Sequence, residues 1–167
     1  MVETNGRNFD LLTLGQVLLR LSPPDNERLS RGDTFVKQVG GAELNVAVGA
    51  ALLGLHTGVI SKLPAHDIGS FMKGKIRSFG VSDDFFMYDQ SPAARVGIYY
   101  YENGAYPRKP KVIYDRNHSS FFSLDIDEIP EEVYTASKCF HTTGITLALN
   151  EDIRETTIEM IKRFKAA

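Results

Sequence analysis

The apolar positions of this chain change their spacing from one stretch to the next, and the changes predict strands and helices in turn. An apolar run at 9–14, closed by Gly15, is typical of a buried strand. Between 44 and 55 the apolar residues recur three, four, seven, eight and eleven positions after Leu44, which is the spacing of one helical face. Gly54 predicts the end of that helix, because glycine readily takes the left-handed conformation found beyond helix ends.

The alternation continues through the next forty or so residues, on the same periodicity argument. A short apolar strand is predicted at 57–63, and a second helical face follows at 68–79. Asp67 is the expected N-cap of that helix, and a third short strand is predicted at 85–88. Strands that alternate with helices in this way predict an α/β fold with a parallel sheet and crossover helices.

A second pattern interrupts this order. No helical spacing separates the apolar runs on either side of Asn103-Gly104, so they are expected to form antiparallel strands. Five of the seven tyrosines lie between Tyr99 and Tyr114, which is typical of a half-buried sheet face or of a ligand platform. We therefore expect a small separate sheet beside the main one, with strands near 17–22, 34–39, 95–102 and 111–116.

The C-terminal third returns to α/β order. The acidic stretch 125–136 is expected to be a helix with Pro130 in its first turn, and 138–142 is expected to be a strand. Asn150 is the predicted cap of a last helix that runs to the end of the chain. A parallel sheet that ends on a helix keeps an apolar edge that further elements normally cover. We therefore expect this chain to be the first part of a longer protein.

Composition narrows the class of protein. In 167 residues, 43% are hydrophobic and 24% are charged, as in a globular domain. Lys and Arg number 19 against 21 Asp and Glu, so the net charge of −2 argues against a nucleic-acid or membrane-surface partner. The single cysteine, Cys139, allows no intrachain disulfide and is expected to be buried filler in an apolar strand. The polar start, Met1 to Asp10, has no signal-peptide core, and these features together predict a cytoplasmic protein.

The best local signal for chemistry is Gly40-Gly41-Ala-Glu-Leu-Asn45, between a predicted strand and a predicted helix. Two glycines allow close approach of the backbone to a ligand, and a helix N-terminus offers free N–H groups to oxygen atoms. Asn45 carries a donor and an acceptor, which suit hydroxyl groups. A tight turn followed by a helix start explains the same residues with no ligand, and the motif alone leaves both readings open.

Other signatures are absent. The chain has no G-x-x-x-x-G-K-[ST], and no G-x-G-x-x-G follows the first strand, which argues against P-loop enzymes and Rossmann-type oxidoreductases. The four histidines have no metal-ligand spacing, and the acidic run 125–132 is expected to be a solvated helix start. We therefore predict no metal site in this chain.

Taken in order, these motifs resemble a known family. The run 40–47, then Gly54 and Asp67-Ile68-Gly69, is similar to the N-terminal signature of the PfkB, or ribokinase-like, carbohydrate kinases. The later runs narrow the resemblance to the 2-keto-3-deoxygluconate kinase branch, and these runs are Gly97-Ile98-Tyr99, Pro107-Arg108, Val112 to Arg116 and Thr143-Gly144-Ile145. The resemblance extends from about residue 9 to the end of the chain.

The resemblance implies an α/β domain, of which residues 1–167 are the N-terminal part, with a small β-sheet lid that pairs two subunits in many members. It places the sugar between the domain and the lid. The substrate-binding residues that it implies are Gly41, Asn45, Tyr99, Tyr114, Arg116 and Ile145. Arg116 is expected to hold the 2-keto-acid end, because a planar guanidinium binds a carboxylate with two hydrogen bonds.

Two residues depart from the family pattern, and both make the exact sugar harder to predict. Gln16 stands where many members have an acidic residue, and Pro64 stands where many have glycine. A larger difference is that the chain contains no Gly-Ala-Gly-Asp, the motif that supplies the anion hole and the catalytic base in the family. The resemblance therefore implies an enzyme that uses ATP and Mg²⁺, with no catalytic residue and no ATP site in these 167 residues.

The leading hypothesis is the sugar-binding portion of a kinase that phosphorylates 2-keto-3-deoxygluconate or a related sugar. The alternative is a non-catalytic fragment that binds sugar or dimerises through the lid strands. A kinase for a neutral sugar such as fructose, and a Rossmann-type oxidoreductase, are the remaining readings.

Overall fold

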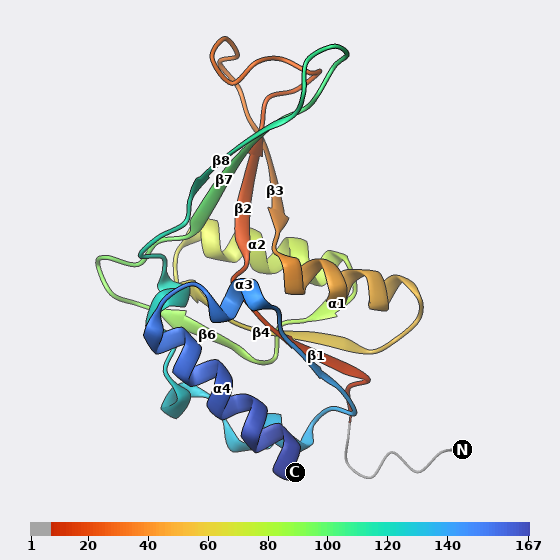
Figure 1. Cartoon of the computed structure of the whole chain (residues 1–167), viewed down its shortest axis with the longest axis vertical. Helices are drawn as coiled ribbons and strands as arrows, with labels where there is room; N and C mark the ends of the chain where they lie inside the picture. Colours follow the sequence, from red (N-terminus) through yellow and green to blue (C-terminus); the bar gives the residue numbers. More distant parts are fainter. Residues whose placement is uncertain (1–7) are drawn as a thin grey trace.

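The computed structural model describes residues 8–167, and residues 1–7 of the polar N-terminal stretch lie outside the described part. A parallel sheet forms the body of the molecule, and a second sheet rises from it (Figure 1). The strand order of the first sheet is β5-β4-β1-β9, with β6 also paired to β4. Its strands are β1 (Leu11–Leu14), β4 (Thr57–Pro64), β5 (Val81–Ser82), β6 (Phe86–Asp89) and β9 (Phe140–His141). The α/β prediction with a parallel sheet is confirmed.

Helices cover both faces of this sheet. Neighbouring residues of a strand point to opposite faces, so the central strand β4 contributes side chains to both. Val59 of β4 packs in one apolar cluster with residues of α1 and α2, and Ile60 packs in a second cluster with residues of α4. All eight residues of β4 are buried. The helices are α1 (Ala42–Leu52), α2 (Asp67–Ser78), the short α3 (Gly144–Leu147) and α4 (Glu151–Ala166). None of the helices within 8–167 is long and apolar enough to cross a bilayer.

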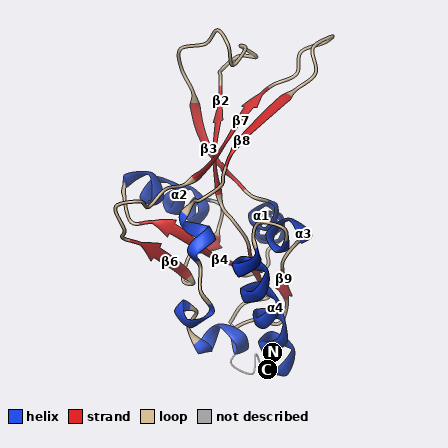
Figure 2. Ribbon diagram, turned by 60° about the vertical axis from the view of Figure 1, so that its left-hand side comes forward, coloured by secondary structure: helices blue, strands red, loops and turns tan. Residues whose placement is uncertain are grey.

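The second sheet has strand order β3-β2-β7-β8 and projects from the body, with its base packed against α2 (Figure 2). We call it the lid sheet, and its strands are β2 (Leu18–Ser22), β3 (Val36–Gly40), β7 (Gly97–Glu102) and β8 (Lys111–Asp115). β7 and β8 pair antiparallel, as predicted, whereas β2 and β7 pair parallel. Four chain segments join the lid sheet to the body, at 15–17, 40–41, 90–96 and 116–119.

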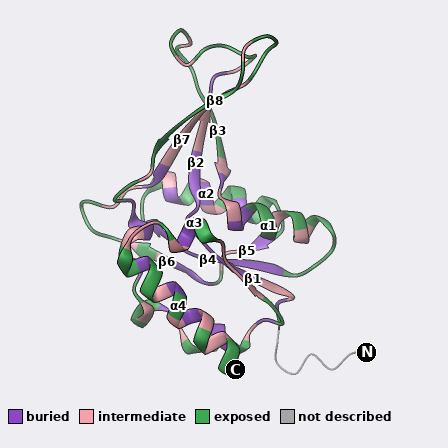
Figure 3. Cartoon of the chain, in the orientation of Figure 1, coloured by how far each residue is buried: buried purple, intermediate pink, exposed green. Residues whose placement is uncertain are grey.

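The tip of the lid sheet consists of two loops that hydrogen bonds tie together, although most of their residues are exposed (Figure 3). Arg108 donates to Oε1 of Glu102 (2.6 Å) and to the carbonyl oxygen of Asn26 (2.6 Å). The backbone N–H of Leu29 donates to Oε2 of Glu102, and this hydrogen bond is the main cause of the lowered pKa of that carboxyl. Arg108 of the resemblance motif therefore holds the lid tip and does not line the ligand cavity described below.

The predicted helix at 125–136 is wrong. The stretch forms two 3₁₀ turns, η2 (Ile126–Glu128) and η3 (Glu131–Thr135), and Pro130 caps the second turn instead of lying within the first turn of a helix. A residue that precedes proline is restricted to extended backbone, and Ile129 has ψ of 119°. A capping box between Asp125 and Glu128 completes the first turn, so the acidic stretch breaks at Ile129.

Three smaller expectations are also corrected. His66, not Asp67, is the N-cap of α2, since its Nδ1 accepts from the backbone N–H of Gly69. Cys139 is exposed and not buried, because β9 is a two-residue edge strand that begins after it. Leu52 and Leu55 were expected on the buried face of α1, but both are exposed, Leu52 to 78%.

Candidate ligand-binding site

One cavity of about 460 Å³ lies between the lid sheet and the N-terminus of α1. The body contributes the start of α1 and the start of α3, and the lid sheet contributes β2, β7 and β8. All six substrate-binding residues that the resemblance implies line this cavity: Gly41, Asn45, Tyr99, Tyr114, Arg116 and Ile145. Segments about a hundred residues apart in sequence thus meet at this cavity. The roles of the six residues in binding a ligand stay a prediction.

Both glycines before α1 are required by the geometry of this cavity. Gly41 has φ of 151°, and a Cβ there would lie 2.7 Å from the carbonyl oxygen of Gln16. A Cβ on Gly40 would lie 2.5 Å from the hydroxyl oxygen of Tyr99. Gly41 is also the N-cap of α1 and offers no side-chain acceptor, so the first N–H groups of the helix lack a side-chain cap. The tight-turn reading explains Gly41, whereas Gly40 is explained by the approach of a lid tyrosine.

Two tyrosines lie directly opposite each other on the lid strands. Tyr99 of β7 pairs in register with Tyr114 of β8, and their ring centroids are 5.9 Å apart. Burial raises the pKa of Tyr99, so its phenol stays protonated and keeps a hydrogen to donate. Beside them, the guanidinium of Arg20 lies 4.3 Å from the ring centroid of Tyr101. The lid thus presents phenol hydroxyls and a cation to the cavity.

Arg116 supplies a second positive charge and is held from one side only. Its Nε–H donates to Oε1 of Gln16 at 2.7 Å, and its guanidinium lies 5.8 Å from the ring centroid of Tyr114. Burial lowers the pKa of Arg116, and electrostatic interaction with Tyr114 and Glu43 opposes that effect. A guanidinium stays protonated in proteins, so the cavity holds a partly desolvated cation. Among residues 8–167, neither terminal Nη atom of Arg116 has a hydrogen-bond or ion-pair partner.

Glu43 closes the floor of the cavity, and the sequence reading did not single it out. The residue is 2% exposed, and its Oε1 accepts from the N–H of Thr143 (3.2 Å) and from the hydroxyls of Thr143 (2.5 Å) and Thr146 (2.7 Å). These bonds tie the first turn of α1 to α3, which carries Ile145. A lone acid within a largely apolar helix is the signal that could have pointed to a buried role.

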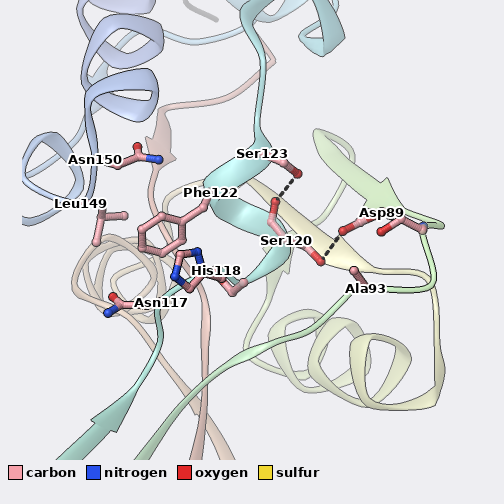
Figure 4. Close-up of a pocket in the computed structure, with 11 residues that line it drawn as sticks. Asp89, Ala93, Asn117, His118, Ser120, Phe122, Ser123, Leu149 and Asn150 are labelled. Carbon is pink, nitrogen blue, oxygen red and sulfur yellow. Dashed lines mark hydrogen bonds between the residues drawn. The ribbon is translucent and has the colours of Figure 1, made fainter.

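A larger cavity of about 720 Å³ is lined by Asp89, by residues of the 117–123 segment and by Leu149 and Asn150 (Figure 4). Among the described residues 8–167, its lining contains one acid, Asp89, and one histidine, His118, but no Lys or Arg. The carboxylate of Asp89 accepts from the hydroxyl of Ser120, and the hydroxyl of Ser123 donates to the carbonyl oxygen of Ser120. These polar groups satisfy one another, so the smaller cavity, with its open guanidinium, is the better candidate. Within 8–167 no group of three or more His, Cys, Asp or Glu could hold a metal ion.

A family model described as pfkB family carbohydrate kinase matches residues 8–167. The chain belongs to this PfkB family. It is 38% identical over 153 residues to a protein of Haloferax volcanii named 2-dehydro-3-deoxygalactonokinase, covering 92% of this chain and 47% of that relative. It is 30% identical over 149 residues to 5-dehydro-2-deoxygluconokinase 1 of Bacillus cereus, covering 89% of this chain and 44% of that protein.

Solved PfkB structures agree with the fold. The crystal structure of 2-dehydro-3-deoxygluconokinase from Thermotoga maritima superposes with a TM-score of 0.89 at 34% identity, covering 95% of this chain and 48% of that one. This PfkB chain therefore spans about half the length of the relatives it matches. The predicted family and its 2-keto-3-deoxygluconate kinase-like branch are confirmed, and the Rossmann-type oxidoreductase reading is wrong.

Proposed function

We propose that this chain forms the sugar-binding side of an ATP-dependent kinase that phosphorylates a hydroxyl of 2-keto-3-deoxygluconate or a related 2-keto sugar acid. The observation that carries the proposal is the Arg116 guanidinium, half-buried in the cavity and with both Nη atoms unpartnered among residues 8–167. A desolvated guanidinium of this kind matches the geometry and the charge of a carboxylate. The names of the 38% relative and of the Thermotoga protein support the same substrate class.

The remaining cavity residues suit the hydroxyl-bearing part of such a ligand. The amide of Asn45 and the phenols of Tyr99 and Tyr114 donate and accept hydrogen bonds, as sugar hydroxyls require. Gly41 lets the ligand approach the start of α1, and Ile145, 50% exposed, forms an apolar wall. In this proposal the acid end of the sugar faces Arg116 and the hydroxyls face the lid.

ATP and Mg²⁺ belong to the proposal for the intact kinase. The sequence contains no Gly-Ala-Gly-Asp, so we place the base, the anion hole and the nucleotide site outside these residues. Phosphoryl transfer depends on positioning and charge stabilisation by those groups. The 167-residue chain by itself is therefore expected to bind sugar without transferring phosphate. The absence of any possible intrachain disulfide supports a cytoplasmic location for the protein.

Arg116→Ala tests the proposal by isothermal titration with 2-keto-3-deoxygluconate. The lost charged hydrogen bonds are expected to weaken binding by about 1.5–3 kcal/mol, which is roughly 10- to 150-fold. Arg31→Ala, on the exposed lid tip, is the matched control and is expected to leave the affinity unchanged.

Two further titrations make this test specific. Fructose has no carboxylate, so its binding is expected to respond much less to Arg116→Ala than that of the sugar acid. ATP is expected not to bind. An unchanged sugar-acid affinity would remove Arg116 from the site, and binding of ATP would mean that the nucleotide pocket is misplaced.

The lid sheet supports a second proposal, a homodimer formed through the lid. Three apolar lid residues, Val36, Val112 and Ile113, are each more than 40% exposed. Val36→Lys is expected to shift a dimer toward monomer in sedimentation velocity, because an ammonium group would be buried in an apolar contact. Ile158→Lys, 40% exposed on α4 and far from the lid, is the control. A wild-type chain that is monomeric at all concentrations would contradict the dimer.

The alternative of a natural non-catalytic sugar-binding or dimerising fragment is separated from the kinase by one measurement. The mass of the protein in its source cells decides between them, since this chain alone has a mass of 18.6 kDa. A mass close to that value leaves no room for a catalytic half.

A further inference from the structure

Gln16 lies in the short connection between β1 and β2 and is only 3% exposed. Its side-chain amide makes two hydrogen bonds to Arg116, which lies one hundred residues later in the sequence. Oε1 of Gln16 accepts from the Nε–H of Arg116 at 2.7 Å, and Nε2 of Gln16 donates to the carbonyl oxygen of Arg116 at 3.2 Å. The other hydrogen on Nε2 goes to the hydroxyl of Ser119 at 2.6 Å. All three polar functions of the buried amide are therefore used.

The chemistry of the partners fixes the orientation of this amide. A guanidinium N–H only donates, so it requires the amide oxygen, and a backbone carbonyl only accepts, so it requires the amide nitrogen. In a flipped amide, the amide N–H would face the guanidinium N–H of Arg116, and the amide oxygen would face the carbonyl oxygen of Arg116. The same partners therefore exclude the flipped orientation. Gln16 thus binds both the side chain and the backbone of Arg116 through a single orientation of its amide.

Gly97 of β7 leaves the space that this pairing needs. A Cβ on Gly97 would lie 2.8 Å from Nε2 of Gln16 and 3.4 Å from Cα of Arg116. The lid strand therefore carries no side chain where the amide meets Arg116. The backbone of β7 therefore encloses the Gln16–Arg116 pairing on the side of Gly97.

We infer that Gln16 is a positioning residue that fixes the Arg116 guanidinium and leaves only its Nη1–Nη2 edge for the carboxylate of a ligand. A guanidinium can bind a carboxylate through its Nε–Nη edge or through its two Nη atoms. The Gln16 bond occupies Nε, so the terminal edge is the one that remains. This inference deepens the proposed function and rests on it for the identity of the ligand.

The first experiment needs no ligand. Hydrogen exchange of the arginine Nε–H groups is measured by ¹⁵N NMR on the whole chain, with the Arg116 signal assigned by its loss in Arg116→Lys. The wild-type Arg116 Nε–H is expected to exchange at least about tenfold more slowly than in Gln16→Ala, since a hydrogen bond of roughly 1.4 kcal/mol protects by that factor. Gln16→Glu keeps the acceptor and is expected to keep the protection. Ser119→Ala removes only the third bond and serves as the matched control.

The second experiment measures binding of 2-keto-3-deoxygluconate and of fructose to the same variants. Gln16→Ala is expected to weaken sugar-acid binding by roughly tenfold, with fructose affected little. This split between an acid and a neutral sugar is a readout that a merely structural role would not move. Gln16→Met, close in shape and without hydrogen bonds to make, replaces Gln16→Ala if the alanine variant fails to fold.

The two experiments separate the inference from the proposed function. Equal exchange rates in wild type and Gln16→Ala, or equal losses for the acid and the neutral sugar, overturn the inference. Protection that depends on Gln16 in a chain that binds no sugar acid contradicts the proposed function, and it still supports the positioning of Arg116 by Gln16.

Discussion

Gly69→Ala is expected to lower the free energy of unfolding by about 3 kcal/mol, the upper range for overpacking a tight contact. Gly69 is buried in the first turn of α2, where the helix approaches the end of β4. A Cβ at this position would lie 2.0 Å from the carbonyl oxygen of Pro64, which is backbone and has no rotamer to change. The helix or the strand must therefore move, and thermal or denaturant unfolding measures the cost.

Gly74→Ala in the same helix is the matched control. Gly74 is exposed, and a Cβ there would meet no atom of residues 8–167 within 4 Å. Alanine in a helix interior is more stable than glycine by about 0.5–1 kcal/mol, so this variant is expected to raise the free energy of unfolding. If both variants shift stability in the same direction, the close approach of α2 to β4 does not explain Gly69.

Glu43→Ala is expected to cost roughly 3 kcal/mol of stability, because it removes the acceptor of charge-assisted hydrogen bonds from Thr143 and Thr146. Those buried donors then lose their partner, and α3 loses its tie to α1. Since α3 carries Ile145, sugar binding is expected to weaken as well. Urea unfolding and titration of the sugar acid on the same preparation measure the two effects.

Glu43→Gln separates the shape of this side chain from its charge. The amide keeps one oxygen as acceptor and is expected to lose about 1 kcal/mol, the worth of weakening charged bonds to neutral ones. Glu155→Ala, on the exposed side of α4, is the control for the loss of any acid. A loss for Glu43→Ala no larger than that control would contradict a structural role for the Glu43 carboxylate.

Local patterns sufficed for β4 and α4. All residues of β4 are buried between two apolar clusters, which explains its continuous apolar run. One apolar face of α4 packs in one of these clusters, and Asn150 caps the helix by accepting from the N–H of Ile153. The exposed Leu52 on α1 was not predictable from periodicity, since spacing shows that residues share a face but not what covers it. The break at Ile129 was visible in Pro130, but an acidic stretch also fits a helix start.

For the candidate site, motif order indicated which residues meet, and the structure added how they are held. Arg116 and Asn45 could be named because they fall at motif positions of the resembled family, and their chemistry agrees with binding a sugar acid. The partners Gln16 and Glu43 could not, because their contacts join segments about a hundred residues apart and depend on the tertiary fold. Gln16 stood out in the sequence only as an unusual residue, and its bond to Arg116 gives that departure a physical meaning.

The four connections between the lid sheet and the body have a mechanical consequence. A lid on one hinge swings freely, whereas a lid on four strands moves only if all four connections bend together. Gln16, Gly41 and Arg116 lie in three of those connections and also line the cavity. Tilting the lid sheet therefore deforms the cavity wall, and a ligand that bridges these residues stiffens the connections between the lid sheet and the body. Lid angle and cavity shape are therefore expected to change together.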